Sequence, residues 1–112
     1  MAGLVSRNAI AFLNRHVDHV VKLELVLNIH SSPSAMTTVP AVARELDVSR
    51  SQVRSMAEEL AADGLVSVAS DHLRLTPSSV EQRWAIADLA QAYRRDPNVV
   101  LDALKALGRA SV

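Results

Sequence analysis

The sequence predicts a mainly α-helical fold with one small β-hairpin, and three features of the chain support this prediction. Apolar residues recur at helical spacing over most of the 112 residues. Residues that favour helix N-caps precede these stretches, and breaks rich in Ser and Pro separate them. After Gly64, two short runs rich in Leu and Val interrupt the helical pattern. We expect a single domain over residues 1–112, divided into segments 6–30, 36–76 and 78–108.

Composition narrows the class of protein to which the chain can belong. Hydrophobic residues make up 49% of the chain, which is enough to build a core. The absence of cysteine excludes a disulfide framework and a thiolate zinc site, and it fits a cytoplasmic location. Twelve basic and twelve acidic residues cancel, so any charge that binds nucleic acid must be local. We expect no signal peptide and no membrane span, because the most apolar stretch, 17–29, is short and carries charges.

Segment 6–30 has the apolar spacing of one helix or of two helices joined near residues 14–18. In the second case Asp18 would cap the second helix. The segment ends at Ser31-Ser32-Pro33, because proline and the residue before it do not continue a helix.

Segment 36–76 begins with a pair of helices. Thr38 is a good N-cap for the first helix, and residues 47–48 form a short turn before Ser49 opens the second. Ser49 and Gln52 have the spacing of a capping box. The second helix presents one apolar stripe, formed by Val53, Met56, Ala57 and Leu60. Gly64 ends this helix at a position that requires positive φ.

The runs 65–68 and 72–75, with Ala69-Ser70-Asp71 between them, predict a two-stranded hairpin. A winged helix-turn-helix has this element order: helix, helix, tight turn, helix, glycine and hairpin. Residues 36–76 resemble winged-helix regulators of the MarR type, and Asp63-Gly64-Leu65-Val66 looks like the junction into the wing. The whole chain is similar to small bacterial winged-helix proteins in which a segment like 89–95 follows the wing. The resemblance implies a bacterial, DNA-binding transcription regulator.

The second helix of the pair would lie in the major groove with its N-terminal residues at base edges. Arg can donate two hydrogen bonds to guanine, and Gln can pair with adenine. No acidic residue lies between Ser49 and Ala57, so this helix start is locally basic. The hairpin weakens the DNA hypothesis, because its tip carries Asp71 and its one basic residue is Arg74. The expected DNA-binding residues are Ser49, Arg50, Ser51, Gln52, Arg54, Ser55 and Arg74.

Segment 78–108 predicts two more helices. Ser78 and Glu81 have capping-box spacing, and Asp96 caps a last helix that starts at Pro97 and ends before Gly108. These helices carry more apolar residues than one stripe needs, which favours self-association over the alternative that both helices fill one core. The expected dimerisation residues are Trp84, Leu89, Tyr93, Val100 and Leu104.

The sequence thus favours a homodimeric regulator that binds double-stranded DNA. The alternative is an adaptor that binds another protein through the winged helix and the C-terminal helices without DNA. We expect no enzyme, no cofactor and no metal, because the chain lacks a phosphate loop, a nucleophile elbow and a cysteine nucleophile. His16 and His19 could share a helix face, but a His-x-x-His pair is weak evidence for zinc without two further ligands.

Overall fold

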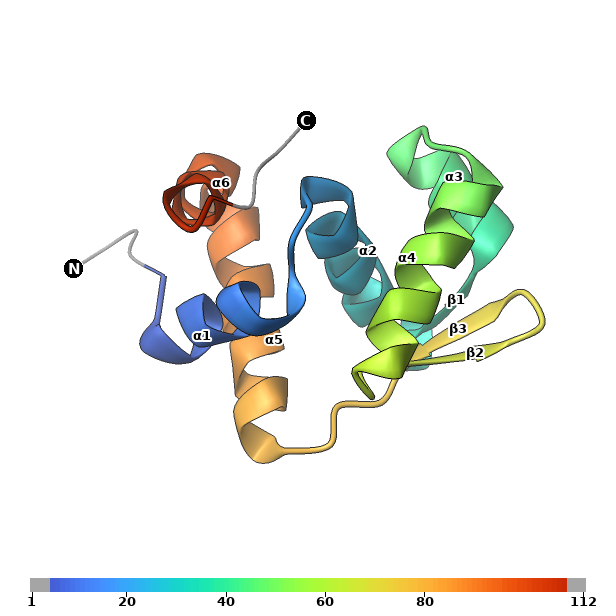
Figure 1. Cartoon of the computed structure of the whole chain (residues 1–112), viewed down its shortest axis with the longest axis horizontal. Coiled ribbons are helices and arrows are strands. Elements are labelled where there is room, and N and C mark those ends of the chain that lie inside the picture. The colour runs from blue at the N-terminus through green and yellow to red at the C-terminus, as the bar shows by residue number, and fades with distance from the viewer. Residues whose placement is uncertain (1–4, 109–112) are drawn as a thin grey trace.

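The computed structural model describes residues 5–108, which form six α-helices and a three-stranded antiparallel sheet (Figure 1). The prediction of a mainly helical fold with a small β-structure is therefore confirmed. None of the helices in this range combines the length and the apolarity that a membrane span requires. In chain order the elements are α1 (Arg7–His16), α2 (Val20–Ser31), the short 3-10 helix η1 (Pro33–Ala35), β1 (Met36–Thr38), α3 (Val39–Leu46), α4 (Arg50–Ala62), β2 (Val66–Ala69), β3 (His72–Leu75), α5 (Val80–Arg95) and α6 (Pro97–Ala106).

The first segment forms two helices, with a break at residues 17–19. The side chain of His19 caps α2, because its Nδ1 accepts the N–H of Val21 at 3.1 Å. The expectation that Asp18 is the cap is wrong. Its carboxylate instead lies 2.9 Å from the ammonium of Lys22, one helical turn further on.

The helix pair α3 and α4 begins where the sequence predicts. Thr38 Oγ1 accepts the N–H of Ala41 at 3.3 Å at the start of α3. Ser49 Oγ accepts the N–H of Gln52 at 3.1 Å at the start of α4. Between the helices, Asp47 takes the left-handed conformation with φ 56°, which a short polar residue tolerates. The chain therefore turns within the three residues 47–49.

Gly64 ends α4 as predicted. Its φ is +80°, a conformation that glycine adopts without steric cost. The N–H of Gly64 donates to Ala61 O at 2.9 Å, and the N–H of Leu65 donates to Leu60 O at 3.0 Å. These two bonds satisfy carbonyls of the last helical turn and direct the chain into β2.

The predicted hairpin is present as β2 and β3, but the sheet has a third strand that the sequence analysis missed. The strand order is β1-β3-β2, and Leu73 at the centre of β3 lies opposite Thr37 on one side and Val68 on the other. Strand β1 contains only three residues, which is too short to show an alternating pattern. It forms because the second edge of β3 offers unpaired backbone groups.

Helix α5 begins one residue later than the predicted capping box. Ser79, not Ser78, is the N-cap, and its Oγ accepts the N–H of Gln82 at 3.1 Å. Gln82 Oε1 in turn accepts the backbone N–H of Ser78 at 2.7 Å. Gln82 therefore takes the role expected of Glu81, because both residue types can return a hydrogen bond to the chain before the helix.

Helix α6 has the predicted start and end. Asp96 Oδ1 accepts the N–H of Asn98 at 3.1 Å, and Pro97 is the first helical residue. Gly108 follows the helix with φ +71°, and its N–H donates to Lys105 O at 2.8 Å. The short turn at Asp96 lets α6 fold back against α5.

Helix α2 lies at the centre of the molecule, between the half that holds α3, α4 and the sheet and the half that holds α1, α5 and α6 (Figure 1). It packs against α3, α4, α5, β1 and β3. Four of its apolar side chains are fully buried in the core that both halves share, namely Leu23, Leu25, Val26 and Ile29. Both halves are therefore built around this one helix.

Lys22 of α2 is buried in spite of its charge. The residue is 5% exposed, and its ammonium lies 2.9 Å from Asp18 and 2.6 Å from Glu59 of α4. Burial lowers the Lys22 pKa, but the hydrogen bonds to Glu59 and Asp18 outweigh it, so that the pKa is raised above its ordinary value. The ion pair therefore fixes α2 against α4.

Tyr93 of α5 contacts α2 from the other side. Its hydroxyl donates to Glu24 Oε2 at 3.4 Å. Burial and the negative charge of Glu24 both disfavour the phenolate, so they raise the pKa of Tyr93. The contacts of Lys22 with Asp18 and Glu59, and of Tyr93 with Glu24, thus depend on two groups that titrate in alkaline solution, the Lys22 ammonium and the Tyr93 hydroxyl.

Of the five side chains assigned to a dimer surface from the sequence, three lie in the core of this chain. Leu89, Val100 and Leu104 are fully buried, so their assignment is wrong. The reason is that α5, which carries Leu89, packs against α1, α2 and α6, and that α6, which carries Val100 and Leu104, packs against α5 and α1. Tyr93 is half-buried against the same core, whereas Trp84 is 60% exposed.

We expect the free energy of unfolding to fall as the pH rises above about 10, where Lys and Tyr ordinarily titrate. Both groups have a raised pKa in the folded chain, so their contribution is complete below the ordinary pKa and is lost as the pH passes through the folded value. Each group can contribute up to about 1.4 kcal/mol per pH unit in that window. Urea unfolding between neutral and alkaline pH measures the loss, which Lys22→Met and Tyr93→Phe should each reduce.

The chain contains a single tyrosine, so the ultraviolet absorbance of phenolate reports the Tyr93 pKa directly. An equal alkaline loss of stability in wild type and in both variants would contradict this account of α2.

Candidate nucleic-acid interface

The first two turns of α4 carry most of the residues expected to bind DNA. Arg50, Ser51 and Ser55 are exposed, while Val53 on the opposite side is buried. Ser49 Oγ accepts a backbone N–H as the cap and also lies 3.3 Å from Ser51 Oγ. The first amides of a helix have no intrahelical partner, so this helix end offers N–H and hydroxyl donors beside one guanidinium. It can bind an anionic or hydrogen-bond-accepting group.

Acidic side chains limit this surface to the N-terminal half of α4. Ser51, Ser55 and Glu58 follow one another along one exposed stripe of the helix. Because Glu58 is negatively charged, a polyanion can bind only to the part of the stripe that precedes it. Glu59 is directed to the other side, where it holds Lys22.

Arg54 does not extend freely from α4 as the sequence suggests. Its guanidinium forms an ion pair with Asp71 and donates to Ser70 O at 3.2 Å. Ser70 and Asp71 are the two turn residues of the β2–β3 hairpin, and Ser70 takes the left-handed conformation with φ 57°. The pair is separated by 17 residues in the chain, so only the folded hairpin brings it together.

Asp71 connects three elements. Its carboxylate holds Arg54 of α4, and its backbone carbonyl accepts the N–H of Val39 at 2.8 Å. Val39 is the first residue of α3. The hairpin turn is thus fixed to the start of α3 and to the second turn of α4, and this fixes the hairpin beside the candidate surface.

Arg74 is separated from the other expected DNA-binding residues. It is exposed on β3, opposite Met36 and Ser67, whereas its neighbour Leu73 is buried. Alternate residues of a strand point to opposite faces, so Arg74 lies on the sheet face that is turned away from α2 and α4.

The charge of the candidate surface is smaller than the sequence suggests. Arg54 is neutralised by Asp71, and Glu45 and Asp47 are exposed close to Arg50 in the chain. Arg44 adds a further exposed cation in the last turn of α3. The surface is therefore polar, with many donors but little excess charge.

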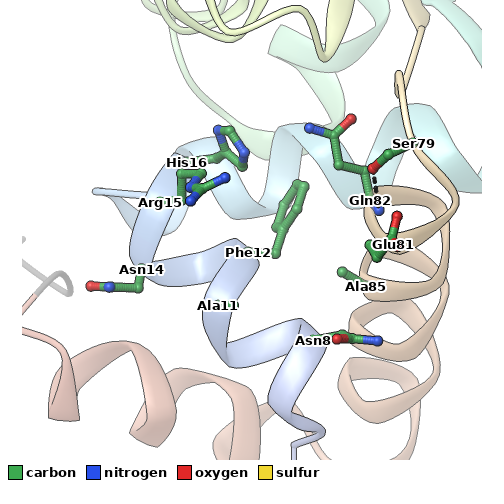
Figure 2. A pocket seen from close by; sticks show the side chains of 10 residues that line it. All are labelled: Asn8, Ala11, Phe12, Asn14, Arg15, His16, Ser79, Glu81, Gln82 and Ala85. Atoms are coloured by element: carbon green, nitrogen blue, oxygen red, sulfur yellow. Dashed lines mark hydrogen bonds between the residues drawn. The ribbon is translucent and has the colours of Figure 1, made fainter.

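A pocket of about 320 Å³ lies elsewhere, between α1 and the start of α5 (Figure 2). The buried side chains Phe12 and Ala85 form its apolar wall. Asn8, Arg15 and Glu81 supply polar groups of both charges around it. Its mixed lining would suit a small polar ligand with one apolar side.

The histidine pair near the first break is separated by the fold. His16 is the last residue of α1, and its Nδ1 lies 3.1 Å from Asp63 Oδ2 at the end of α4. His19 is occupied as the N-cap of α2. Among residues 5–108, no three His, Asp or Glu side chains are grouped in a way that could hold a metal ion.

We expect Arg54→Ala and Asp71→Ala to destabilise the fold by less together than the sum of the single effects. The coupling should be about 0.5 kcal/mol, because both side chains are substantially exposed and their pairing is screened by water. Urea unfolding of the two single variants and the double variant measures it. Arg74→Ala removes a comparable cation from the outer face of the sheet and serves as the control. Strictly additive losses would mean that the ion pair does not hold the hairpin.

No protein-family model, no curated protein and no solved structure matches this chain.

Proposed function

We propose that the chain is a DNA-binding transcription regulator of the winged-helix type, in which α4 enters the major groove and the β2–β3 hairpin is the wing. One observation carries the proposal. A helix, a three-residue turn, a second helix and a hairpin follow one another, and the first two turns of the second helix are exposed and free of acidic residues. A recognition helix contacts base edges with this part of its surface.

The side chains of α4 have separate roles in this proposal. Arg50 is the base-reading cation, because a guanidinium can donate two hydrogen bonds to one guanine. Gln52 is half-buried and reaches an adenine at the edge of the contact. Ser49, Ser51 and Ser55, with the first amides of α4, bind phosphate oxygens and orient the helix.

Arg54 positions the wing rather than reading a base, since Asp71 and Ser70 already accept its donors. Arg74 contributes less than the sequence suggests, because it lies on the outer face of the sheet. Few phosphate contacts remain, so we expect the affinity to depend weakly on salt compared with strongly basic DNA-binding proteins.

The regulator acts as a homodimer in this proposal. A single α4 offers a short contact, and two copies would read two half-sites about one helical turn of DNA apart. The cytoplasm, where the target DNA of a bacterial regulator lies, is the proposed location.

Arg50→Ala should weaken binding to the preferred duplex by about tenfold to a hundredfold, the loss expected for one bidentate base contact. The duplex is selected from a pool of short randomised sequences with the wild-type chain, and affinities are then measured by fluorescence anisotropy. Arg15→Ala removes an exposed arginine from α1 and should leave binding unchanged.

Equal affinities for wild type and Arg50→Ala would refute the assigned surface. Failure to enrich any duplex at low salt would refute DNA recognition as a whole, provided that the chain is folded by circular dichroism.

The second candidate is an adaptor that binds another protein. The exposed side chains of Val80 (51%) and Trp84 (60%) on α5 favour it, as does the net charge of zero. The duplex selection separates the two candidates, because an adaptor enriches no DNA sequence. Its binding to another protein also does not change in Arg50→Ala.

A further inference from the structure

Trp84 has a large apolar side chain that the core of the chain does not cover. It is the one tryptophan in a chain with 3% aromatic residues, and it is 60% exposed. Large aromatic side chains contribute most when they are buried, and Val80, one helical turn away, is exposed as well, so this part of α5 is suited to contact a partner.

The exposed side of α5 forms a stripe that runs opposite to its buried side. Val80, Trp84, Ala87 and Gln91 are all exposed and recur at intervals of four, three and four residues. We call these four residues the α5 seam. The side facing the core contains Ala85, Ile86 and Leu89, all of which are buried. Helix α5 therefore carries apolar residues on a second side, Val80, Trp84 and Ala87, which the described residues 5–108 leave exposed.

We propose that the α5 seam pairs with the same seam of a second copy, with the two α5 helices parallel. Spacing of four and three residues is that of the positions that meet along a two-helix coiled coil. Trp84 and Gln91 then occupy one class of seam position, and Val80 and Ala87 occupy the other. The small Ala87 leaves room beside the large Trp84.

The charges that flank the seam favour a second copy and set its direction. Arg83 and Asp88 are both exposed and lie on opposite sides of the stripe. In a parallel pair, a residue on one flank faces the residue five positions later on the opposite flank of the partner helix. Arg83 of each copy therefore meets Asp88 of the other, twice by symmetry. Asp88 Oδ2 also accepts a hydrogen bond from Ser6 Oγ at 2.9 Å, which holds the carboxylate at this flank.

The antiparallel arrangement is less favourable for the same charges. It brings equal flanks together, so that Arg83 no longer faces Asp88, and Glu81, which is exposed on the same flank as Asp88, lies near Asp88 of the other copy. Like charges in contact oppose association. The flanking charges therefore distinguish between the two directions.

Parallel pairing has a consequence for α4. In Figure 1, α5 runs upward and α4 runs obliquely downward on the other side of α2. A two-fold axis along α5 therefore points the N-termini of both α4 helices to the same side, as reading two half-sites requires. The pairing supplies the dimer of the proposed function, but it rests on α5 alone and its tests contain no DNA. Its failure and the failure of DNA binding are therefore separate results.

The single tryptophan reports the pairing directly. The seam is shorter than a standard interface, so we expect reversible association between about 1 μM and 1 mM. Over this series the sedimentation coefficient should rise, and Trp84 emission should shift to shorter wavelength. Trp84→Ala should raise the dissociation constant at least tenfold. Met36→Ala removes another exposed apolar side chain, from β1, and should have no effect. A monomer with constant Trp84 emission throughout the series would overturn the proposal.

Cross-linking tests the direction of the helices. The natural chain has no cysteine, so Ala87→Cys introduces a single thiol on the seam. Parallel pairing places this thiol beside its copy, and mild oxidation should yield a covalent dimer at concentrations where wild type is mostly monomeric. Ser67→Cys, on the exposed face of the sheet, is the control. Equal cross-linking of both variants would refute the parallel seam.

Charge reversal tests the flanks. Arg83→Glu should weaken association several-fold because it places Glu against Asp88, and Arg83→Glu with Asp88→Arg should restore it. Failure of the double variant to recover, with an unchanged circular dichroism melt, would refute the Arg83–Asp88 pairing.

Discussion

The burial of α2 is the constraint on which the rest of the structure depends. This helix contacts both halves of the molecule and is covered on almost every side. An unpaired ammonium at such a place would cost several kcal/mol, so Lys22 requires its carboxylates. Asp18 and Glu59 supply them from the break before α2 and from α4. The same contact that stabilises the centre therefore sets the position of the helix proposed to read DNA.

The hairpin turn acts as a second fixed point. Through its carboxylate and its carbonyl, Asp71 connects the hairpin to α4 and to α3. The acidic residue that would weaken the hairpin as a phosphate-binding element is thus the residue that holds the hairpin in place. A surface built in this way relies on shape and hydrogen bonding more than on charge. This agrees with a chain whose formal charges sum to zero.

The two sides of α5 explain why the C-terminal third is rich in apolar residues. One side completes the core together with α1, α2 and α6, and the other carries Trp84 to the surface. The two interpretations of this segment, core filling and self-association, therefore apply to different residues of the C-terminal helices. Leu89, Val100 and Leu104 belong to the first, and the α5 seam belongs to the second as we propose it.

The sequence by itself determined the local structure, because caps, helical spacing and positive-φ positions act over a few residues. Thr38, Ser49, Gly64 and Asp96 have the predicted roles, and the helix and hairpin order follows from them. Only the tertiary structure decided which long-range partners meet. The pairing of Arg54 with Asp71, the addition of β1 to β3 and the covering of three apolar side chains in the C-terminal helices join residues far apart in the chain. Such contacts depend on the packing of whole elements, which no local pattern records.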